Sequence, residues 1–357
     1  MDTDRFRHQS FSQLVLFGNR RRAEIPDLVT QLGLHRCLVL STPEQRRDAE
    51  ALAETLGQAA VGVLAEAVMH TPVEVSDAAA SKARDLRADS TIGIGGGSTI
   101  GLGKAIALRT GLPQIAVPTT YAGSECTPIL GETADGQKKT QRNPIVVPAA
   151  IVYDPELTLT LPARSSGMSG MNALAHAVEA LYSPERSPLL AELAAEGVRA
   201  LARALPRVVD APSDVDARTD ALYGAWLCGT CLATSEMALH HKICHVLGGL
   251  FNLPHAETHA LVLPYVVAFN RPAVPDAVER LAGALSADDP VGAVFDLAGA
   301  VGAPRSLAEL GMPEDGIDPA VDLILADRYW NPRPLTRPEI ERLVEAMYEG
   351  SHDGAPG

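Results

Sequence analysis

Gly93-Ile94-Gly95-Gly96-Gly97-Ser98-Thr99-Ile100-Gly101-Leu102-Gly103-Lys104 is the stretch of sequence that decides the fold. It follows a strand-like run at residues 90–94 and opens a helical pattern that continues to about residue 110. Glycines in such a turn let the backbone approach a ligand, and the helix N-terminus offers unpaired N–H groups and a positive dipole end. We therefore predict a phosphate site at Gly95, Gly96 and Gly97, with hydroxyl donors from Ser98 and Thr99. The spacing matches neither G-x-G-x-x-G nor a Walker A loop, so a tight turn without a ligand is the alternative.

Outward from this turn, strand-like and helix-like segments alternate, which predicts parallel strands joined by crossover helices. The predicted strands are 36–40, 61–64, 90–94 and 114–117, and the predicted helices are 44–56, 77–87 and 100–110. This pattern assigns residues 1–162 to an α/β domain with a doubly wound, mostly parallel sheet.

After Pro162 the segments become rich in Ala and Leu with helical periodicity, and β-branched runs are almost absent. The predicted helices are 169–182, 187–205, 214–236, 237–250, 276–285, 291–301 and 337–348. Residues 163–357 are therefore predicted to form an all-α second domain.

Two further segments at strand ends concern the same ligand. Thr119, Thr120 and Tyr121 directly follow the strand at 114–117, where α/β proteins bind ligands, and an ordinary polar loop is the alternative. Ser41 follows the strand at 36–40, in a position where a carboxylate would select the ribose of NAD and repel a 2′-phosphate. Its presence predicts tolerance of NADPH as well as NADH.

Of the ten histidines, four candidates lie in two short stretches of the second domain, and His240 and His259 flank them. Asn172 and His176 share one helix face, as do His241 and His245, and His255 follows ten residues later. An Asp in place of Asn172 would complete a plausible divalent-metal site, but an amide lacks the anionic charge that offsets a dication. We therefore predict a polar catalytic pocket without a metal, with structural core histidines as the alternative. Cys228 and Cys231 are interpreted as core thiols.

Composition limits the class of protein. The chain has 357 residues, 46% apolar and 21% charged, with a formal net charge of −14, which excludes a disordered chain and argues against nucleic-acid or anionic-membrane partners. Five cysteines form no disulfide framework, and neither a signal peptide nor an apolar run of about 18 residues is present. These features predict a cytoplasmic protein.

The motifs together resemble the iron-containing (group III) alcohol dehydrogenase superfamily. The matching pieces are GIGGGSTIGLGKAIA, IAVPTTYAGSE, GMNALAHAVEA and HHKICHVLGGLFNLPHAETHA, in that order. Met69-His70-Thr71-Pro72, Leu130-Gly131-Glu132-Thr133 with Thr140-Gln141-Arg142, Asn172 and Trp330-Asn331-Pro332-Arg333-Pro334 are similar to the maleylacetate reductase branch of that superfamily.

The resemblance implies a dehydroquinate synthase-like architecture, a homodimer and an active site between a dinucleotide-binding domain and a helical domain. The metal ligands of metal-using relatives fall here on Asn172, His176, His241 and His255, while His245 matches a further histidine near the reaction centre. The implied reaction is the NAD(P)H-dependent reduction of the conjugated C=C of maleylacetate to 3-oxoadipate in aromatic-compound degradation, without a metal. Tyr265 departs from the histidine that many relatives carry.

For this dicarboxylate substrate we expect His241 and His245 to donate to the enolate oxygen and supply a proton, with Asn172, His176 and His255 lining the pocket. Arg142, Lys242 and Arg333 are candidates to hold the carboxylates, with Tyr121 beside them; solvated surface charge is the alternative for each base. Three other functions stay open: a metal-dependent alcohol or aldehyde reductase, a reductase of another unsaturated oxo acid, and a cofactor-binding module without catalysis.

Overall fold

A computed structural model describes residues 6–134 and 137–351, and the chain divides into two compact units. The N-terminal unit is Gln9–Leu161; the C-terminal unit begins at Pro162 and includes the described residues before Gln9. His8 belongs to the helical unit because its Nδ1 lies 3.1 Å from the hydroxyl of Ser187, which caps α6 (Pro188–Asp210).

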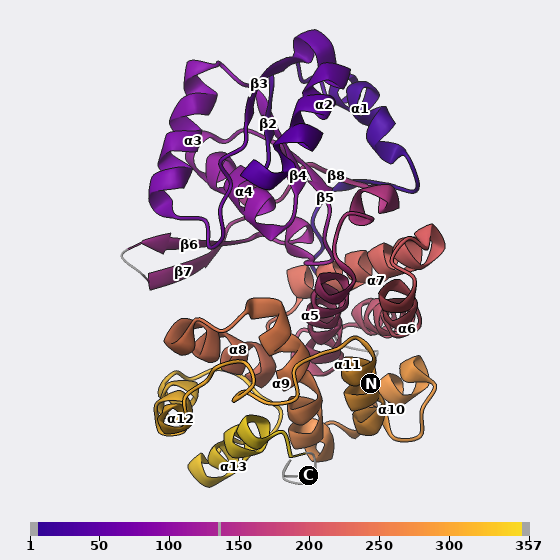
Figure 1. Cartoon of the computed structure of the whole chain (residues 1–357), viewed down its shortest axis with the longest axis vertical. Helices are drawn as coiled ribbons and strands as arrows, with labels where there is room; N and C mark the ends of the chain where they lie inside the picture. Colours follow the sequence, from indigo (N-terminus) through magenta and orange to yellow (C-terminus); the bar gives the residue numbers. More distant parts are fainter. Residues whose placement is uncertain (1–5, 135–136, 352–357) are drawn as a thin grey trace. The chain divides into compact units, whose positions relative to one another are not determined.

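The N-terminal unit contains a six-stranded, fully parallel sheet with the strand order β1-β8-β5-β4-β2-β3 (Figure 1). The strands are β1 (Leu14–Phe17), β2 (Cys37–Leu40), β3 (Ala60–Leu64), β4 (Ser90–Gly95), β5 (Gln114–Pro118) and β8 (Ala150–Tyr153). Each of the four inner strands is buried along its whole length, as expected for parallel strands covered on both faces. The sheet confirms the predicted α/β class.

Helices cover both faces of this sheet, which makes it doubly wound. The helices are α1 (Ile25–Gln31), α2 (Arg46–Leu56), α3 (Val73–Asp85) and α4 (Gly97–Thr110). Side chains of α1 and α2 form one apolar core with Val39, Ile92 and Ile115, whereas side chains of α3 and α4 pack against Leu38 and Leu40 on the other face. Successive residues of β2 thus point to opposite layers.

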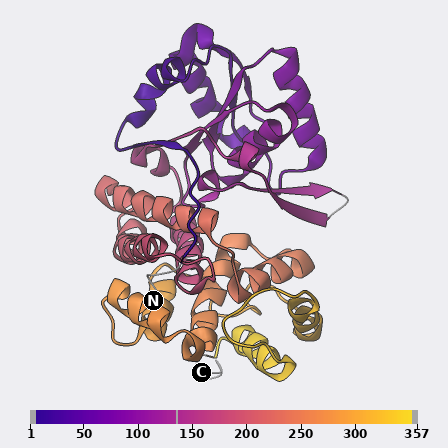
Figure 2. The same cartoon turned by 180° about the vertical axis from the view of Figure 1, so that it is seen from behind.

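A separate antiparallel hairpin, β6 (Ile129–Ala134) and β7 (Gln137–Arg142), was not predicted. It extends from the side of the unit and does not join the sheet (Figure 1 and Figure 2). Its polar sequence lacks the apolar alternation of a half-buried strand, and it is anchored by Thr133, whose backbone N–H donates to the Thr71 carbonyl at 3.3 Å.

The C-terminal unit is helical, as predicted. Its helices are α5 (Ala163–Tyr182), α6, α7 (Val215–Thr234), α8 (Leu239–Phe251), α9 (His255–Asn270), α10 (Pro275–Leu285), α11 (Pro290–Ala300), α12 (Ile317–Ala326) and α13 (Arg337–Glu349). The helix α5 is buried over almost its entire length, and α8, α9, α12 and α13 share one large apolar core. None of the helices in residues 6–134 and 137–351 is long and apolar enough to cross a bilayer.

Candidate active site

Six histidines of the C-terminal unit gather into one cluster. They come from three helices: His176 on α5, His240, His241 and His245 on α8, and His255 and His259 on α9. Ring centroids are 5.1 Å apart for His176 and His241, 4.9 Å for His241 and His259, and 4.3 Å for His255 and His259. The structure thus brings together four histidines predicted for the site and adds two neighbours.

The cluster is accessible at one end and sealed at the other. His245 and His255 are exposed, and their rings stack with centroids 6.5 Å apart. His176 and His241 are nearly buried behind them, and His240 and His259 are fully buried. A small molecule entering from solvent would therefore meet His245 and His255 first and His176 and His241 next.

Local backbone geometry explains why α8 and α9 meet at this point. The helix α8 ends at Asn252, which adopts the left-handed conformation with φ 53°, and α9 starts three residues later at His255. Asn is among the residues that tolerate this conformation best. The sharp reversal places the first turn of α9, with His255 and His259, against the first two turns of α8.

Five buried polar atoms in and beside the cluster have no hydrogen-bond partner among the described residues. They are Asn172 Oδ1, His176 Nδ1, His240 Nδ1, His241 Nε2 and His259 Nε2. Asn172 and His176 lie one turn apart on α5, as the i, i+4 spacing predicted. Because buried polar groups are nearly always satisfied, these atoms mark a place where a ligand or water binds.

Glu179 is a functional residue that was not predicted from the sequence. It is buried on α5, and one of its carboxylate oxygens lies 2.7 Å from His241 Nδ1. It also accepts the backbone N–H groups of Ala238 and His240, each at 2.9 Å, at the start of α8. The signal was available, because residues 172, 176 and 179 follow the spacing of a single helix face.

Burial controls the charge of the inner histidines. Desolvation, with smaller contributions from neighbouring histidines, lowers the pKa values of His176, His240 and His259 well below the ordinary value of 6.5. These three imidazoles are therefore neutral at neutral pH.

The donor set in this chain differs from the metal-ligand set of metal-using relatives at one position. Asn172 supplies a neutral amide where a carboxylate is needed, and the remaining three positions are imidazoles. Within the described residues, the trio whose donor atoms come within 4.8 Å of one another is instead His240, Cys244 and His259.

That trio is explained by a hydrogen bond. His240 Nε2 and His259 Nδ1 lie 2.9 Å apart. Their other ring nitrogens are buried with no partner in the described part of the chain, so the outer contacts that normally orient metal-binding histidines are missing. Cys228 and Cys231 are buried and not joined in a disulfide, as predicted for core thiols.

Two basic residues predicted for substrate binding take part in contacts within the C-terminal unit. Lys242 forms an ion pair with Asp327 at 2.8 Å and lies 5.8 Å from the centre of the Tyr329 ring. Arg333 donates to the Phe269 carbonyl at 2.7 Å and pairs with Glu339 at 2.8 Å. Because both terminal nitrogens of Arg333 have these partners, its guanidinium connects the loop before α13 to the end of α9.

The other two predicted substrate residues belong to the N-terminal unit. Arg142 is exposed at the end of β7. Tyr121 is fully buried, with its hydroxyl 3.4 Å from that of Thr158. The Tyr121 side chain therefore packs in the interior of its unit, although the sequence predicted a contact with substrate.

The glycine-rich turn has the geometry of a phosphate cradle. The helix α4 starts at Gly97, three residues earlier than predicted, and its N-cap residue Gly96 supplies no side-chain cap. A Cβ at Gly95 would collide with the Thr99 hydroxyl, and one at Gly96 would lie 2.9 Å from Thr120, whereas Gly97 faces open space. The first N–H groups of α4 are thus left for a ligand.

Hydroxyl groups surround this turn. The Thr119 backbone N–H donates to the Gly95 carbonyl at 3.1 Å, and its side-chain oxygen accepts from Gln45 at 3.0 Å. The Thr99 hydroxyl is buried with no partner among the described residues. Ser98 and Thr120 are partly exposed. Ser41 is fully buried, its hydroxyl has no partner among the described residues, and its backbone bonds to Leu64 and Ala67.

Lys104 distinguishes this turn from a P-loop. Its ammonium group is buried in α4 and donates to the carbonyls of Ser124, Thr127 and Ile129 at 2.5–2.9 Å. Burial lowers the Lys104 pKa to about 7. The side chain therefore fixes the loop that leads to β6 and does not reach toward a phosphate.

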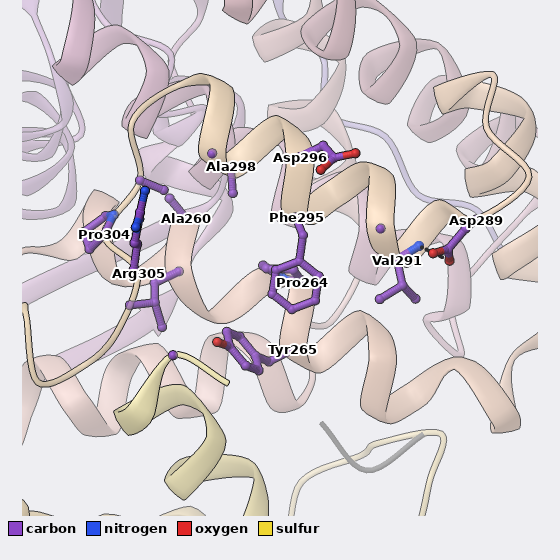
Figure 3. Close-up of a pocket in the computed structure, with 15 residues that line it drawn as sticks. Ala260, Pro264, Tyr265, Asp289, Val291, Phe295, Asp296, Ala298, Pro304 and Arg305 are labelled. Atoms are coloured by element: carbon purple, nitrogen blue, oxygen red, sulfur yellow. Dashed lines mark hydrogen bonds between the residues drawn. The ribbon is translucent and has the colours of Figure 1, made fainter. Parts of the chain in front are cut away.

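The C-terminal unit also contains a cavity of about 720 Å³ between α9 and α11 (Figure 3). Tyr265 lines it, with its ring 5.0 Å from that of Phe295 in an edge-on arrangement. None of the predicted catalytic histidines lines this cavity. Tyr265, the residue that departs from the family pattern, thus lines this cavity and is not part of the histidine cluster.

Comparison with known proteins gives a consistent result for both units. Residues 12–155 match the family model of iron-containing alcohol dehydrogenases, and residues 166–348 match the C-terminal model of the same family. A maleylacetate reductase of Sphingobium indicum is 52% identical over 336 residues, which cover 94% of this chain and 95% of the relative.

Solved structures agree with this. The crystal structure of maleylacetate reductase from Agrobacterium tumefaciens superimposes with a TM-score of 0.95 at 49% identity, covering 99% of this chain and all of the other. A sulfoacetaldehyde reductase from Bifidobacterium kashiwanohense, solved in complex with NAD+, gives a TM-score of 0.90 at 25% identity, covering 98% of this chain and all of the other. The chain belongs to the iron-containing alcohol dehydrogenase family, and it is an oxidoreductase.

Proposed function

We propose that the protein reduces the conjugated C=C bond of maleylacetate to give 3-oxoadipate, with NADH or NADPH as reductant, as a step in the degradation of aromatic compounds. The observation that carries this proposal is a buried histidine cluster in which Asn172 stands where metal-using relatives have an anionic ligand. The similarity to proteins named maleylacetate reductase over nearly the full chain supports the same substrate.

The cofactor would be held by the cradle at the start of α4. Gly95, Gly96 and Gly97 would receive the diphosphate, with Ser98, Thr99, Thr119 and Thr120 around it. Bound NAD(P)H supplies the hydride. Ser41, in place of a carboxylate at this strand end, would allow NADPH as well as NADH.

The histidines would stabilise charge and deliver a proton. Conjugate reduction places negative charge on the ketone oxygen as an enolate, which hydrogen-bond donors stabilise without a Lewis acid. We assign donation to that oxygen, and the proton that completes the reaction, to His241 and His245. His245 is exposed and can exchange its proton with water, while His241 lies deeper beside His176.

Asn172, His176 and His255 would line and orient the pocket. The unsatisfied Asn172 Oδ1 and His176 Nδ1 are available to order the substrate or a water molecule. Arg142 and Lys242 are the bases we retain for the two carboxylates. Lys242 would exchange its ion pair with the exposed Asp327 for a substrate carboxylate, whereas the Arg333 guanidinium is held by both the Phe269 carbonyl and Glu339.

We further propose that the protein acts without a metal, as a homodimer in the cytoplasm. The donor set at Asn172 supports the absence of a metal, and family resemblance supports the dimer. Five buried cysteines that form no disulfide support a reducing compartment.

The test is an NAD(P)H-oxidation assay with maleylacetate beside a panel of simple aldehydes, with and without chelator. We expect turnover of maleylacetate that chelator does not change. In the same assay His245→Ala should lose turnover by about 10²-fold or more, whereas the surface variant His35→Ala should not. Fast aldehyde reduction with no activity on maleylacetate, or loss of activity with chelator, would overturn the proposal.

A further inference from the structure

We propose that Glu179 is the positioning residue of this site: its carboxylate holds the His241 ring through Nδ1 and thereby presents Nε2 as the atom that exchanges a proton with substrate. The inference rests on the proposed function and extends it to a residue outside the metal-ligand and histidine positions. Three features of the contacts around Glu179 support it.

The first feature is that the carboxylate itself is fixed. Glu179 is 1% exposed, and each of its oxygens accepts one backbone N–H from the start of α8, from Ala238 and His240 at 2.9 Å. These N–H groups belong to the N-terminus of a 13-residue helix, where a negative charge is favoured. Glu179 therefore cannot turn away from His241 without leaving two helix-terminal donors unsatisfied.

The second feature is the direction of the His241 contact. The distance from Glu179 Oε2 to His241 Nδ1 is 2.7 Å, in the range of charge-assisted hydrogen bonds. A carboxylate is an acceptor, so Nδ1 carries a proton whichever charge state the ring has. The position of Nε2 is then set, and this atom is buried with no partner among the described residues.

The third feature separates His241 from its neighbours. His240 Nε2 is hydrogen-bonded to His259, and His176 Nδ1 has no partner in the described part of the chain. Neither His240 nor His176 therefore has a carboxylate partner in the described part of the chain, as His241 does. Among the described rings of the cluster, His241 is therefore the one that a buried carboxylate orients.

Glu179→Gln is the variant that tests this inference. The amide has the same shape but no negative charge and only one accepting oxygen. With that oxygen in the Oε2 position, the amide nitrogen faces the His240 N–H; with it in the Oε1 position, the nitrogen faces both the Ala238 N–H and His241 Nδ1. We expect kcat with maleylacetate to fall by about 10²-fold. The KM for NADH should stay within about twofold, because no residue assigned to the cofactor changes. Glu179→Asp, which keeps the charge, should recover part of kcat.

The matched control is Glu185→Gln. Glu185 also accepts a backbone N–H, from Glu236 at 2.9 Å in the loop that leads into α8, together with the Ser183 hydroxyl, and within the described residues no contact joins it to an imidazole. This variant should keep kcat within about twofold of wild type. A loss of equal size in both variants would assign the effect to anchoring of α8 and overturn the inference.

A spectroscopic measurement separates this inference from the proposed function. In 15N-histidine spectra of the wild-type protein, His241, assigned by comparison with His241→Gln, should show a protonated Nδ1, and Glu179→Gln should change that signal. If wild type does not reduce maleylacetate, the proposed function fails and the spectra still test the pair. If wild type is active and Glu179→Gln retains kcat, raises only KM, or leaves the His241 signal unchanged, the inference is wrong.

Discussion

Asn172 is the residue whose chemistry most separates this site from a metal centre. It lies one turn before His176, with its side-chain oxygen buried and unsatisfied among the described residues. In Asn172→Asp the same position would carry a buried carboxylate beside several imidazoles. Such a charge is costly unless a cation pairs with it, so the variant should gain affinity for a divalent metal and be stabilised by it.

We therefore expect Asn172→Asp, dialysed against Zn²⁺ and then buffer, to retain up to about one metal per chain, with reduced turnover of maleylacetate. Elemental analysis and melting temperature with and without Zn²⁺ are the measurements. Asn143→Asp is a suitable control, since Asn143 caps a short turn in the N-terminal unit and Asp caps equally well. Stoichiometric metal in the wild-type protein would contradict this account.

The neutral histidines predict how stability depends on pH. Folded-state pKa values of His176, His240 and His259 lie well below the unfolded value near 6.5, so below that pH the unfolded chain binds more protons than the folded chain. The free energy of unfolding should therefore have its full value above about pH 6.5. Below that pH it should decrease by up to about 1.4 kcal/mol per pH unit for each of these histidines.

Urea unfolding at pH 7.5 and 5.5 measures this effect. His259→Gln should lose part of the decrease between the two pH values, while the exposed His35→Ala should retain it. Equal stability of the wild-type protein at both pH values would show that these imidazoles are not held neutral.

At the scale of the element, α4 decides cofactor binding through its uncapped N-terminus. Gly97 is its first residue, is exposed and has open space where a Cβ would lie. Gly97→Asp fits sterically but places a negative charge where the diphosphate would bind. We expect the dissociation constant for NADH to rise by about tenfold or more, measured by fluorescence titration.

Gly283→Asp is the matched control, because Gly283 is exposed on α10 and also has open space around it. It should leave NADH binding unchanged. Unaltered affinity in Gly97→Asp would mean that the glycine-rich turn is only a tight connection between β4 and α4, which is the alternative the sequence left open.

Comparison of elements shows what sequence patterns could predict. The inner strands β2, β4 and β5 were predicted within two residues because parallel strands buried on both faces are continuous apolar runs, whereas the fourth inner strand, β8, is also such a run and was missed. The helix α9 was missed because it is buried all round and contains Pro264, so it has no amphipathic period. The edge strand β1 was missed because it is short and only partly buried.

In the candidate site, too, local patterns were predicted and contacts between helices were not. Residues four apart on one helix were placed together correctly, whereas Glu179 and the His240–His259 contact depend on how α5, α8 and α9 pack. Trp330 and Asn331 have a structural explanation: Trp330 lies 6.4 Å from the Tyr182 ring, and Asn331 exchanges hydrogen bonds with Asn270 at 2.9–3.1 Å. The motif that suggested a substrate arginine thus secures a loop.

For the whole molecule, the net charge of −14 opposes long-range attraction of an anionic cofactor or dicarboxylate. Capture must therefore depend on short-range groups: the N–H donors of α4 for the diphosphate, and Lys242 with Arg142 for carboxylates. Several other cations are bound in internal ion pairs, such as Arg22 with Asp154 and Arg109 with Glu132, and add nothing to attraction at a distance.

This distribution of charge predicts an unusual salt dependence. Raising ionic strength from about 0.01 M to 0.1 M shortens the screening length from about 30 Å to about 10 Å, which removes the repulsion between acidic surface and dianionic substrate. We expect kcat/KM for maleylacetate to stay constant or rise over this range, measured in two salts with different anions to separate screening from competition. Lys242→Gln should lower kcat/KM at every salt concentration, because it removes a local contact and not a distant field. Enzymes whose cationic surface attracts an anionic substrate lose kcat/KM steeply as salt is added. A steep fall of the wild-type kcat/KM with salt would therefore mean that a cationic surface guides the substrate despite the net charge.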